Sequence, residues 1–114
     1  MANNISSSFD IVKKLIGDKW KMLIIFHLFN GRKRTSELMY YIDGITQKVL
    51  TQNLRELEHL GIIKREVFAE VPPRTDYYLT DIGYSLKPIL ESLFSWSLDY
   101  TNLMEKGNKN NTKS

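Results

Sequence analysis

The sequence contains no cysteine among its 114 residues. Disulfide bonds, thiolate nucleophiles and cysteine-ligated zinc or iron–sulfur sites are therefore excluded. Only two histidines are present, His27 and His59, and their spacing matches no zinc motif. The sequence also has no glycine-rich phosphate loop, no Gly-x-Ser-x-Gly turn and no catalytic arrangement of serines and carboxylates. We therefore expect neither an enzyme nor a bound cofactor.

Long apolar runs are absent as well. The longest run, residues 22–29, is interrupted by His27, whereas a membrane-spanning helix needs about 20 apolar residues. The polar N-terminal segment lacks the apolar core of a signal peptide. These features predict a cytoplasmic protein that has no membrane partner.

The charge is small in total but uneven along the chain. A net charge of +3 does not by itself identify a polyanionic partner. Residues 31–65 carry seven cations against four anions, whereas residues 81–105 carry one cation against four anions. Residues 106–114 add three lysines and no acid. The cations therefore concentrate in the first two thirds of the chain and in its last nine residues.

Helical periodicity dominates the first 60 residues. The first predicted helix covers residues 9–16. Three further helices each follow an N-cap candidate: Asp18 precedes residues 19–29, Thr35 or Ser36 precedes a short third helix, and Thr46 precedes a helix that runs to about Leu60. Gly17 and Gly61 suit the positions just after helices. The result is a helix, a short helix, a tight turn at residues 43–44 and another helix.

The apolar period changes to two at residue 63. Residues 63–68 and 77–79 read as two strands around a loop with two prolines, which indicates a β-hairpin. Thr80 caps a last helical region, and Pro88 predicts a break near residues 84–87. Beyond Pro88, apolar residues surround most of the helix, which is typical of a helix buried on more than one side.

This order of elements is that of a winged helix-turn-helix. We therefore predict a mainly α (α+β) fold with a two-stranded β-hairpin wing. The chain would comprise a flexible N-terminal arm (residues 1–8), the winged domain (9–105) and a disordered basic tail (106–114). The helix over about residues 46–60 would enter the DNA major groove, and the hairpin over about residues 63–79 would lie at the minor groove.

The polar face of the helix over residues 46–60 supplies the candidate base contacts, Gln47, Thr51 and Gln52. A glutamine amide can pair with adenine through two hydrogen bonds, and threonine can donate one or meet a thymine methyl group. Lys48 and Arg55 would contact phosphate, or Arg55 a guanine edge. Ordinary solvated surface is the alternative for each of these residues. Two acids of this helix, at positions 56 and 58, fall in its C-terminal half, away from the end expected in the groove.

Further DNA-binding candidates lie at helix starts and on the wing. Thr35, Ser36 and Thr46 could present backbone N–H groups to phosphate, although plain capping explains them equally well. Lys64 flanks the base of the wing, where a cation also keeps an exposed strand soluble. Arg74, at the wing tip, could enter a minor groove. Its alternative is an ion pair with Asp76 or Glu70.

Several segments of the sequence resemble one bacterial family. Residues 16–20 (IGDKW), 44–58 (GITQKVLTQNLRELE) and 71–83 (VPPRTDYYLTDIG), together with the segment from Leu93 to Trp96, are similar to HxlR-type transcription regulators, relatives of the MarR group. The resemblance covers residues 7–100.

The resemblance implies a homodimeric, repressor-like regulator on a palindromic operator of double-stranded DNA. Two recognition helices about 34 Å apart would meet successive major grooves. The first and last helices would be dimerisation helices, which agrees with the apolar helix beyond Pro88. The expected interface residues are Phe9, Val12, Leu90, Leu93, Phe94, Trp96 and Tyr100.

One departure from the family limits the signal that this protein could sense. Many members carry an oxidant-sensing cysteine at the position that Ser7 occupies here, so thiol-based sensing is unavailable to this sequence. An unidentified small-molecule effector is a further candidate partner. The alternative function is a winged-helix module for protein–protein or RNA contacts.

Overall fold

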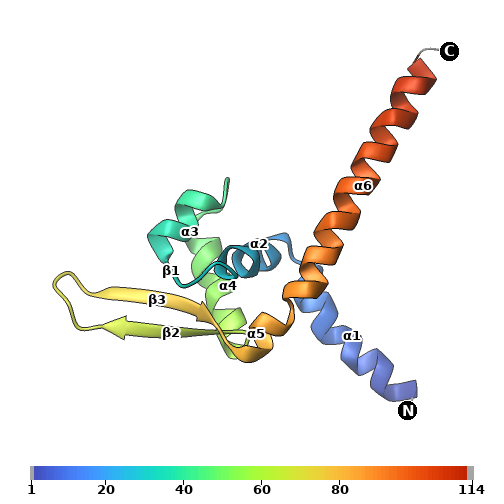
Figure 1. Ribbon diagram of the computed structural model, residues 1–114. Coiled ribbons are helices and arrows are strands. Elements are labelled where there is room, and N and C mark those ends of the chain that lie inside the picture. The colour runs from blue at the N-terminus through green and yellow to red at the C-terminus, as the bar shows by residue number, and fades with distance from the viewer. Residues whose placement is uncertain (1, 113–114) are drawn as a thin grey trace. The chain divides into compact units, whose positions relative to one another are not determined.

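The computed structural model describes residues 2–112, with side chains over residues 5–107 (Figure 1). The chain divides into two compact units, and the boundary between them in the sequence falls between Tyr84 and Ser85. The first unit contains five helices and a small antiparallel sheet, and the second consists almost entirely of one helix. The predicted mainly helical fold with a β-hairpin is confirmed.

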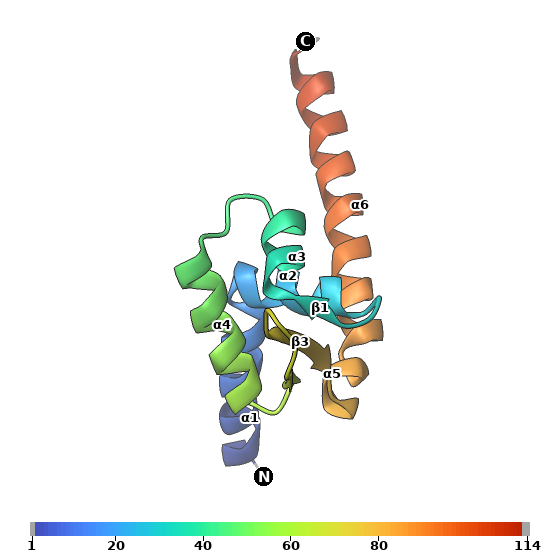
Figure 2. The same cartoon turned by 90° about the vertical axis from the view of Figure 1, so that its left-hand side faces the viewer.

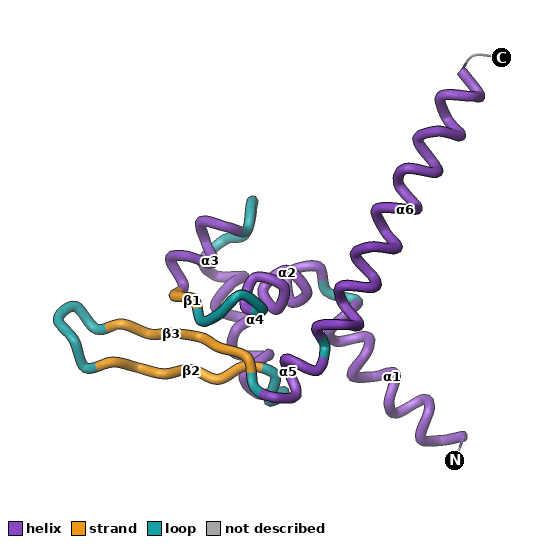
Figure 3. The backbone as a smooth tube through the Cα atoms, viewed as in Figure 1, coloured by secondary structure: helices purple, strands orange, loops and turns teal. Residues whose placement is uncertain are grey.

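The elements follow the order expected of a winged helix-turn-helix (Figure 3). They are α1 (Ala2–Ile16), α2 (Lys19–Leu28), β1 (Lys33–Arg34), α3 (Thr35–Tyr41), α4 (Gln47–His59), β2 (Ile63–Phe68), β3 (Arg74–Leu79), α5 (Asp81–Ser85) and α6 (Lys87–Thr112).

Local capping explains where α2 and α4 begin. The Asp18 carboxylate accepts hydrogen bonds from the backbone N–H groups of Trp20 (2.9 Å) and Lys21 (3.3 Å). The Thr46 hydroxyl accepts one from the N–H of Val49 at 3.2 Å. Each cap satisfies donors that have no partner inside the helix. The predicted N-caps Asp18 and Thr46 are therefore confirmed.

The core of the first unit gathers around α2, which contacts α1, α3, α4 and β3. Its centre consists of fully buried aliphatic side chains: Ile24, Ile25 and Leu28 from α2, Leu38 from α3, Leu50, Leu54 and Leu57 from α4, and Ile63 from β2. One face of α4 is thereby fixed against the core, and the opposite face is left to solvent.

The sheet has three strands in the order β1-β3-β2, one more than the sequence predicted. The hairpin pairs Ile63 with Leu79 at its base and Phe68 with Arg74 at its tip. Strand β1 adds only the pairs Lys33–Tyr77 and Arg34–Asp76. Two residues are too few to show an alternating pattern, so this strand is stabilised by pairing with β3 and not by a local signal.

The junction after the hairpin ties α5 to the end of α4. The Thr80 hydroxyl donates to the carbonyl oxygens of Gly61 and Ile62 and accepts from the N–H of Gly83. Gly83 is buried, and a side chain there would collide with the Ile62 carbonyl oxygen and Leu79. This close approach holds the base of the wing against the C-terminal end of α4.

Helix α6 starts at Lys87, after a break at Leu86 that agrees with the expected effect of Pro88. The sequence predicted that this helix is buried on several sides. In the single chain its large apolar side chains are mostly exposed: Ile89, Leu93, Phe94, Trp96, Leu98, Tyr100, Leu103 and Met104. Within the described residues, no helix combines the length and apolarity needed to cross a membrane.

The helices extend further toward both ends than the sequence indicated. Helix α1 begins at Ala2, where a flexible arm over residues 1–8 was expected. Ile5 precedes Phe9 by four residues, which continues the apolar stripe by one turn. Helix α6 continues to Thr112 through most of the expected disordered tail. Lysines near a helix C-terminus favour such an extension because they complement the helix dipole.

Candidate nucleic-acid interface

The solvent side of α4 forms a shallow groove of polar side chains. Figure 2 shows α4 along one side of the first unit, with α3 next to it. The groove is lined by Gln47, Lys48, Thr51, Gln52, Arg55 and Glu56. The structure thus brings together the five candidate DNA-contacting residues within α4. Neither Lys48 nor Arg55 forms an ion pair in the described part of the chain.

Glu56 shares this groove with the candidate base contacts. The sequence places Glu56 in the C-terminal half of the helix, away from the end expected in the groove. Glu56 does lie far along the helix from Thr46. It nevertheless follows Gln52 by one turn and is next to Arg55 in sequence. Residues four apart lie on the same helix face, so Glu56 continues the row of Gln52.

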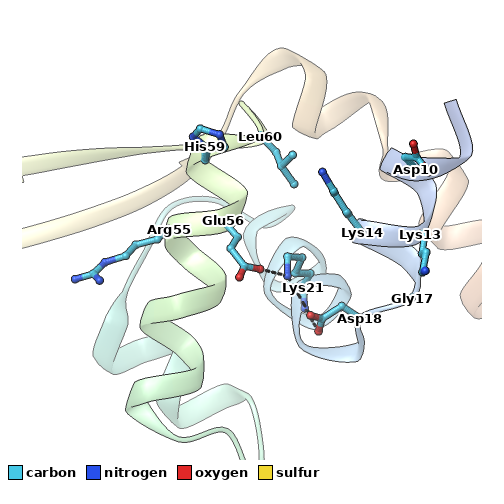
Figure 4. A pocket seen from close by; sticks show the side chains of 10 residues that line it. All are labelled: Asp10, Lys13, Lys14, Gly17, Asp18, Lys21, Arg55, Glu56, His59 and Leu60. Carbon is cyan, nitrogen blue, oxygen red and sulfur yellow. Dashed lines mark hydrogen bonds and ion pairs between the residues drawn. The ribbon is translucent and has the colours of Figure 1, made fainter. Parts of the chain in front are cut away.

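A buried lysine of α2 holds Glu56 in place (Figure 4). Lys21 Nζ donates to Asp18 Oδ2 and to Asn53 Oδ1, both at 3.0 Å, and forms a shorter ion pair with Glu56 Oε2. The Lys21 side chain is only 7% exposed. The Asn53 amide donates in turn to the Val49 carbonyl oxygen at 2.9 Å. Charge and hydrogen bonds thus connect α2 to α4 across the core.

The charged groups of this cluster stabilise one another. Burial disfavours the Lys21 ammonium, but hydrogen bonds to Glu56 and Asp18 outweigh burial and raise the pKa of Lys21. Burial likewise opposes the Asp18 carboxylate, and the hydrogen bonds from Lys21 lower the pKa of Asp18 below 3.8. The hydrogen bond from Lys21 is the main cause that lowers the pKa of Glu56, with a further hydrogen bond from the Gln52 side chain. All three groups are charged at neutral pH.

A second, larger hollow lies between α1 and the C-terminal half of α4 (Figure 4). It has a volume of about 980 Å³, and its lining includes Lys13 and Lys14 of α1 and Arg55, His59 and Leu60 at the α4 side. The Lys21 cluster forms part of the same wall. Arg55 and Glu56 therefore face both hollows.

The candidates at the helix starts have mainly structural surroundings. Thr46 is the N-cap of α4, with its hydroxyl used as described above. Thr35 and Ser36 are the first two residues of α3, and the N-cap is Arg34 rather than either of them. The Arg34 N–H donates to the Glu37 carboxylate at 2.9 Å, which takes the place of the expected hydroxyl cap.

The wing carries its arginines in ion pairs. Arg74 is the first residue of β3 and not part of the loop, with Nε 3.2 Å from Asp76 Oδ1 and its guanidinium over the Phe68 ring. Arg32 contacts Glu66 at 2.5 Å and Asp76 at 3.7 Å. The hydrogen bond to Glu66 raises the pKa of Arg32. For Arg74 the structure therefore shows the ion pair with Asp76, which was the alternative to entering a minor groove. Lys64 on β2 is exposed and forms no ion pair within the described chain.

Most of the expected dimer-interface residues are exposed. Phe9 and Val12 lie on α1 with 61% and 38% of their surfaces exposed. On α6 the residues that share this exposure are Leu93, Phe94, Trp96 and Tyr100, whereas Leu90 is buried in the single chain. The Trp96 and Tyr100 rings stack with centroids 5.3 Å apart.

Lys21 and Asn53 are functional-site residues that the sequence did not predict. A usable signal existed, because each polar residue falls on an apolar helix face. Lys21 precedes Ile24 and Ile25 by three and four residues, and Asn53 follows Leu50 by three residues and precedes Leu57 by four. Buried charges are usually paired, so a lysine and an amide on two core-facing stripes indicate a mutual contact. The described residues contain no group of three or more His, Cys, Asp or Glu side chains that could hold a metal ion.

A polar, cation-bearing helix fixed on a helical core, next to a β-hairpin, defines a winged helix-turn-helix DNA-binding protein. The family model of the HxlR-like helix-turn-helix matches residues 15–105. The chain belongs to this family of transcriptional regulators and is not an enzyme.

Known relatives agree with this assignment. The chain is 50% identical over 91 residues to the uncharacterized HTH-type transcriptional regulator YkvN of Bacillus subtilis, which covers 80% of this chain and 77% of YkvN. It is 47% identical to YtcD of the same organism, over 83% of this chain and 75% of YtcD. The crystal structure of ytcD superimposes with a TM-score of 0.77, over 82% of this chain and 96% of that one. The redox regulator HypR in its reduced form reaches 0.80 at 37% identity, over 87% and 98%.

Proposed function

We propose that this regulator binds double-stranded DNA sequence-specifically, as a homodimer on a palindromic operator, with α4 in the major groove. The observation that carries this proposal is the division of α4 into two faces. Leu50, Leu54 and Leu57 fix one face in the core. The other face presents amides, a hydroxyl and two cations that have no ion pair among the described residues. Such a face suits hydrogen bonding to base edges and phosphates.

Within this face, Gln47, Thr51 and Gln52 are the proposed base contacts. Lys48 and Arg55 are the proposed phosphate contacts, because an unpaired cation gives up no ion pair on meeting DNA. Phosphate contacts fix the register on the duplex, and base contacts supply the sequence preference.

Contacts from the rest of the unit are proposed as auxiliary. Thr35, Ser36 and Thr46 would meet phosphate near the starts of α3 and α4. Lys64 and Arg74 would follow the DNA backbone beside the minor groove. Arg74 must share or exchange its pair with Asp76 to do so.

Dimerisation through α1 and α6 is supported by their exposed apolar side chains. Monomeric soluble proteins rarely leave large apolar patches exposed, and α6 by itself exposes Ile89, Leu93, Phe94, Trp96, Leu98, Tyr100, Leu103 and Met104. Trp96 is the proposed anchor, because it is 63% exposed although it is the largest side chain on α6. Large aromatic side chains dominate the energetics of protein interfaces.

We further infer a repressor-like action in the cytoplasm, on the nucleoid, with release controlled by a signal that does not act through a thiol. HypR is described as a redox regulator, whereas this sequence contains no cysteine. The hollow between α1 and α4 is the proposed place for an effector, since a ligand there would touch Arg55.

The deciding experiment begins with selection of bound duplexes from a random pool, followed by titration of the selected duplex at several salt concentrations. Affinity is expected to fall with salt at a logarithmic slope of about −0.9 per phosphate contact. The Gln52→Ala variant is expected to lose ~1–3 kcal/mol on the selected duplex and little on random DNA. An affinity independent of salt would refute DNA binding and favour a module for protein contacts. Equal losses on both duplexes would reassign Gln52 to the DNA backbone.

A further inference from the structure

An acidic side chain lies among the proposed DNA contacts. Glu56 lines the α4 groove together with Gln52 and Arg55. A carboxylate that faces a polyanion lowers the affinity for any DNA sequence, because like charges repel. Glu56 therefore does not serve general DNA affinity, and a role in sequence preference would account for its place in the groove.

The position of Glu56 is set from the core and not from the surface. An ammonium group has three N–H donors. Lys21 Nζ has three partners, namely Asp18, Asn53 and Glu56, so its donors are fully used. Because Lys21 is buried and all three of its N–H donors are used, Glu56 is anchored to α2 and its side chain cannot change rotamer freely.

Glu56 in turn lies beside Gln52. The two residues line the same groove one helical turn apart, a spacing at which a glutamine amide can donate to a carboxylate. A glutamine amide has two N–H donors and one carbonyl oxygen. One donor used by Glu56 leaves one N–H and the carbonyl oxygen, which is the pair needed to bind the N7 and N6 atoms of adenine.

We propose that Glu56 is a positioning residue that sets DNA sequence preference: anchored by the buried Lys21, it orients the Gln52 amide toward a base edge. This inference rests on the proposed function, because Gln52 is taken to contact a base. It differs from that function in assigning the preference to a residue that touches no DNA. Lys21 holds the Glu56 carboxylate before DNA arrives, so the acceptor that orients Gln52 is already in place when the amide meets the base.

The test compares Glu56→Ala with Glu58→Ala. Both substitutions remove one negative charge from the same helix, but Glu58 does not line the groove and pairs with Arg65 at 3.8 Å. The measured quantity is the ratio of affinities for the selected duplex and for a random duplex. Glu58→Ala is expected to leave the ratio unchanged. Glu56→Ala is expected to lower it about 10-fold, within the range of one two-bonded base contact, while binding to random DNA is kept or increased.

A double-mutant cycle shows whether Glu56 acts through Gln52. In the Gln52→Ala background, Glu56→Ala is expected to change the ratio less than twofold, because the oriented amide is already gone. A full and additive loss in that background would overturn the proposal. So would an unchanged ratio in Glu56→Ala alone, or the same loss in Glu58→Ala.

A second variant controls for folding. Glu56→Gln keeps an oxygen acceptor for Gln52, so we expect it to retain most of the preference while circular dichroism and thermal unfolding match the parent protein. A ratio as low as in Glu56→Ala would contradict the orienting role. If the parent protein itself prefers no duplex, the proposed function fails. If the parent and Gln52→Ala behave as proposed while Glu56→Ala keeps its preference, only this inference fails.

Discussion

Replacing Gly83 by alanine tests the junction between α4 and the wing. Gly83 is helical, and a Cβ built there lies well inside 3.0 Å of the Ile62 carbonyl oxygen and 2.9 Å from Leu79 Cδ2. The carbonyl cannot move away freely, because it accepts hydrogen bonds from the Thr80 N–H and hydroxyl, each at 3.0 Å.

The expected magnitude follows from opposing contributions. Alanine in place of glycine stabilises a helix interior by about 1 kcal/mol. Overpacking costs ~1–3 kcal/mol, and weakening the two Thr80 bonds adds about 1 kcal/mol. Gly83→Ala should therefore destabilise the protein by about 2 kcal/mol, which corresponds to a decrease in Tm of roughly 10 °C for a domain of this size.

Gly107→Ala is the matched control. Gly107 also lies in a helix, and a Cβ there would have no neighbour within 4 Å. This variant should be stabilised, by about 0.5 kcal/mol, since only the helix propensity changes. Thermal and urea unfolding, followed by circular dichroism at one fixed protein concentration, would measure both variants. A Gly83→Ala protein as stable as the parent, or two shifts of the same sign, would refute the reasoning.

Three further predictions concern the cap, the charge cluster and the proposed dimer. Thr46→Ala should destabilise the protein by about 1 kcal/mol in urea unfolding, because α4 loses its N-cap bond; Thr46→Ser should restore it. The lowered pKa values of Asp18 and Glu56 stabilise the fold above the ordinary carboxyl pKa values of 3.8 and 4.5, and this stability is lost as the pH falls through the lower folded values. Unfolding between pH 7 and pH 2 should therefore show a shallower acid dependence in Lys21→Met than in the parent, and equal slopes would contradict the cluster. Trp96→Ala should raise the dimer dissociation constant, and an unchanged mass by light scattering on dilution would reject the role of Trp96.

The sequence predicted the parts of the fold that short-range chemistry determines. Asp18 and Thr46 cap helices through bonds to residues two and three positions away, so their role is visible in a short stretch of sequence. Strand β1 was missed because its only support is pairing with Tyr77 and Asp76, more than 40 positions away. The helix periodicity likewise identified the outer face of α4.

The candidate site depended on contacts between helices that periodicity does not show. Helical spacing places Glu56 near Gln52, but it does not show that Lys21 reaches across from α2 to hold it. For the same reason the wing cations were counted as available to DNA. Arg74 contacts Asp76, whose side chain is only 8% exposed.

The cations of α4 and of the wing differ in whether they are already held in ion pairs. Lys48 and Arg55 can neutralise phosphates without breaking any ion pair seen in the described chain. Arg74 would first have to leave Asp76, and removing one partner of a buried charge pair is costly. A guanidinium has five N–H donors, however, so Arg74 can keep its contact with Asp76 and still offer donors to DNA. The salt dependence of binding should therefore reflect mainly α4, and the wing should contribute geometry, with Arg74 held in position by Asp76.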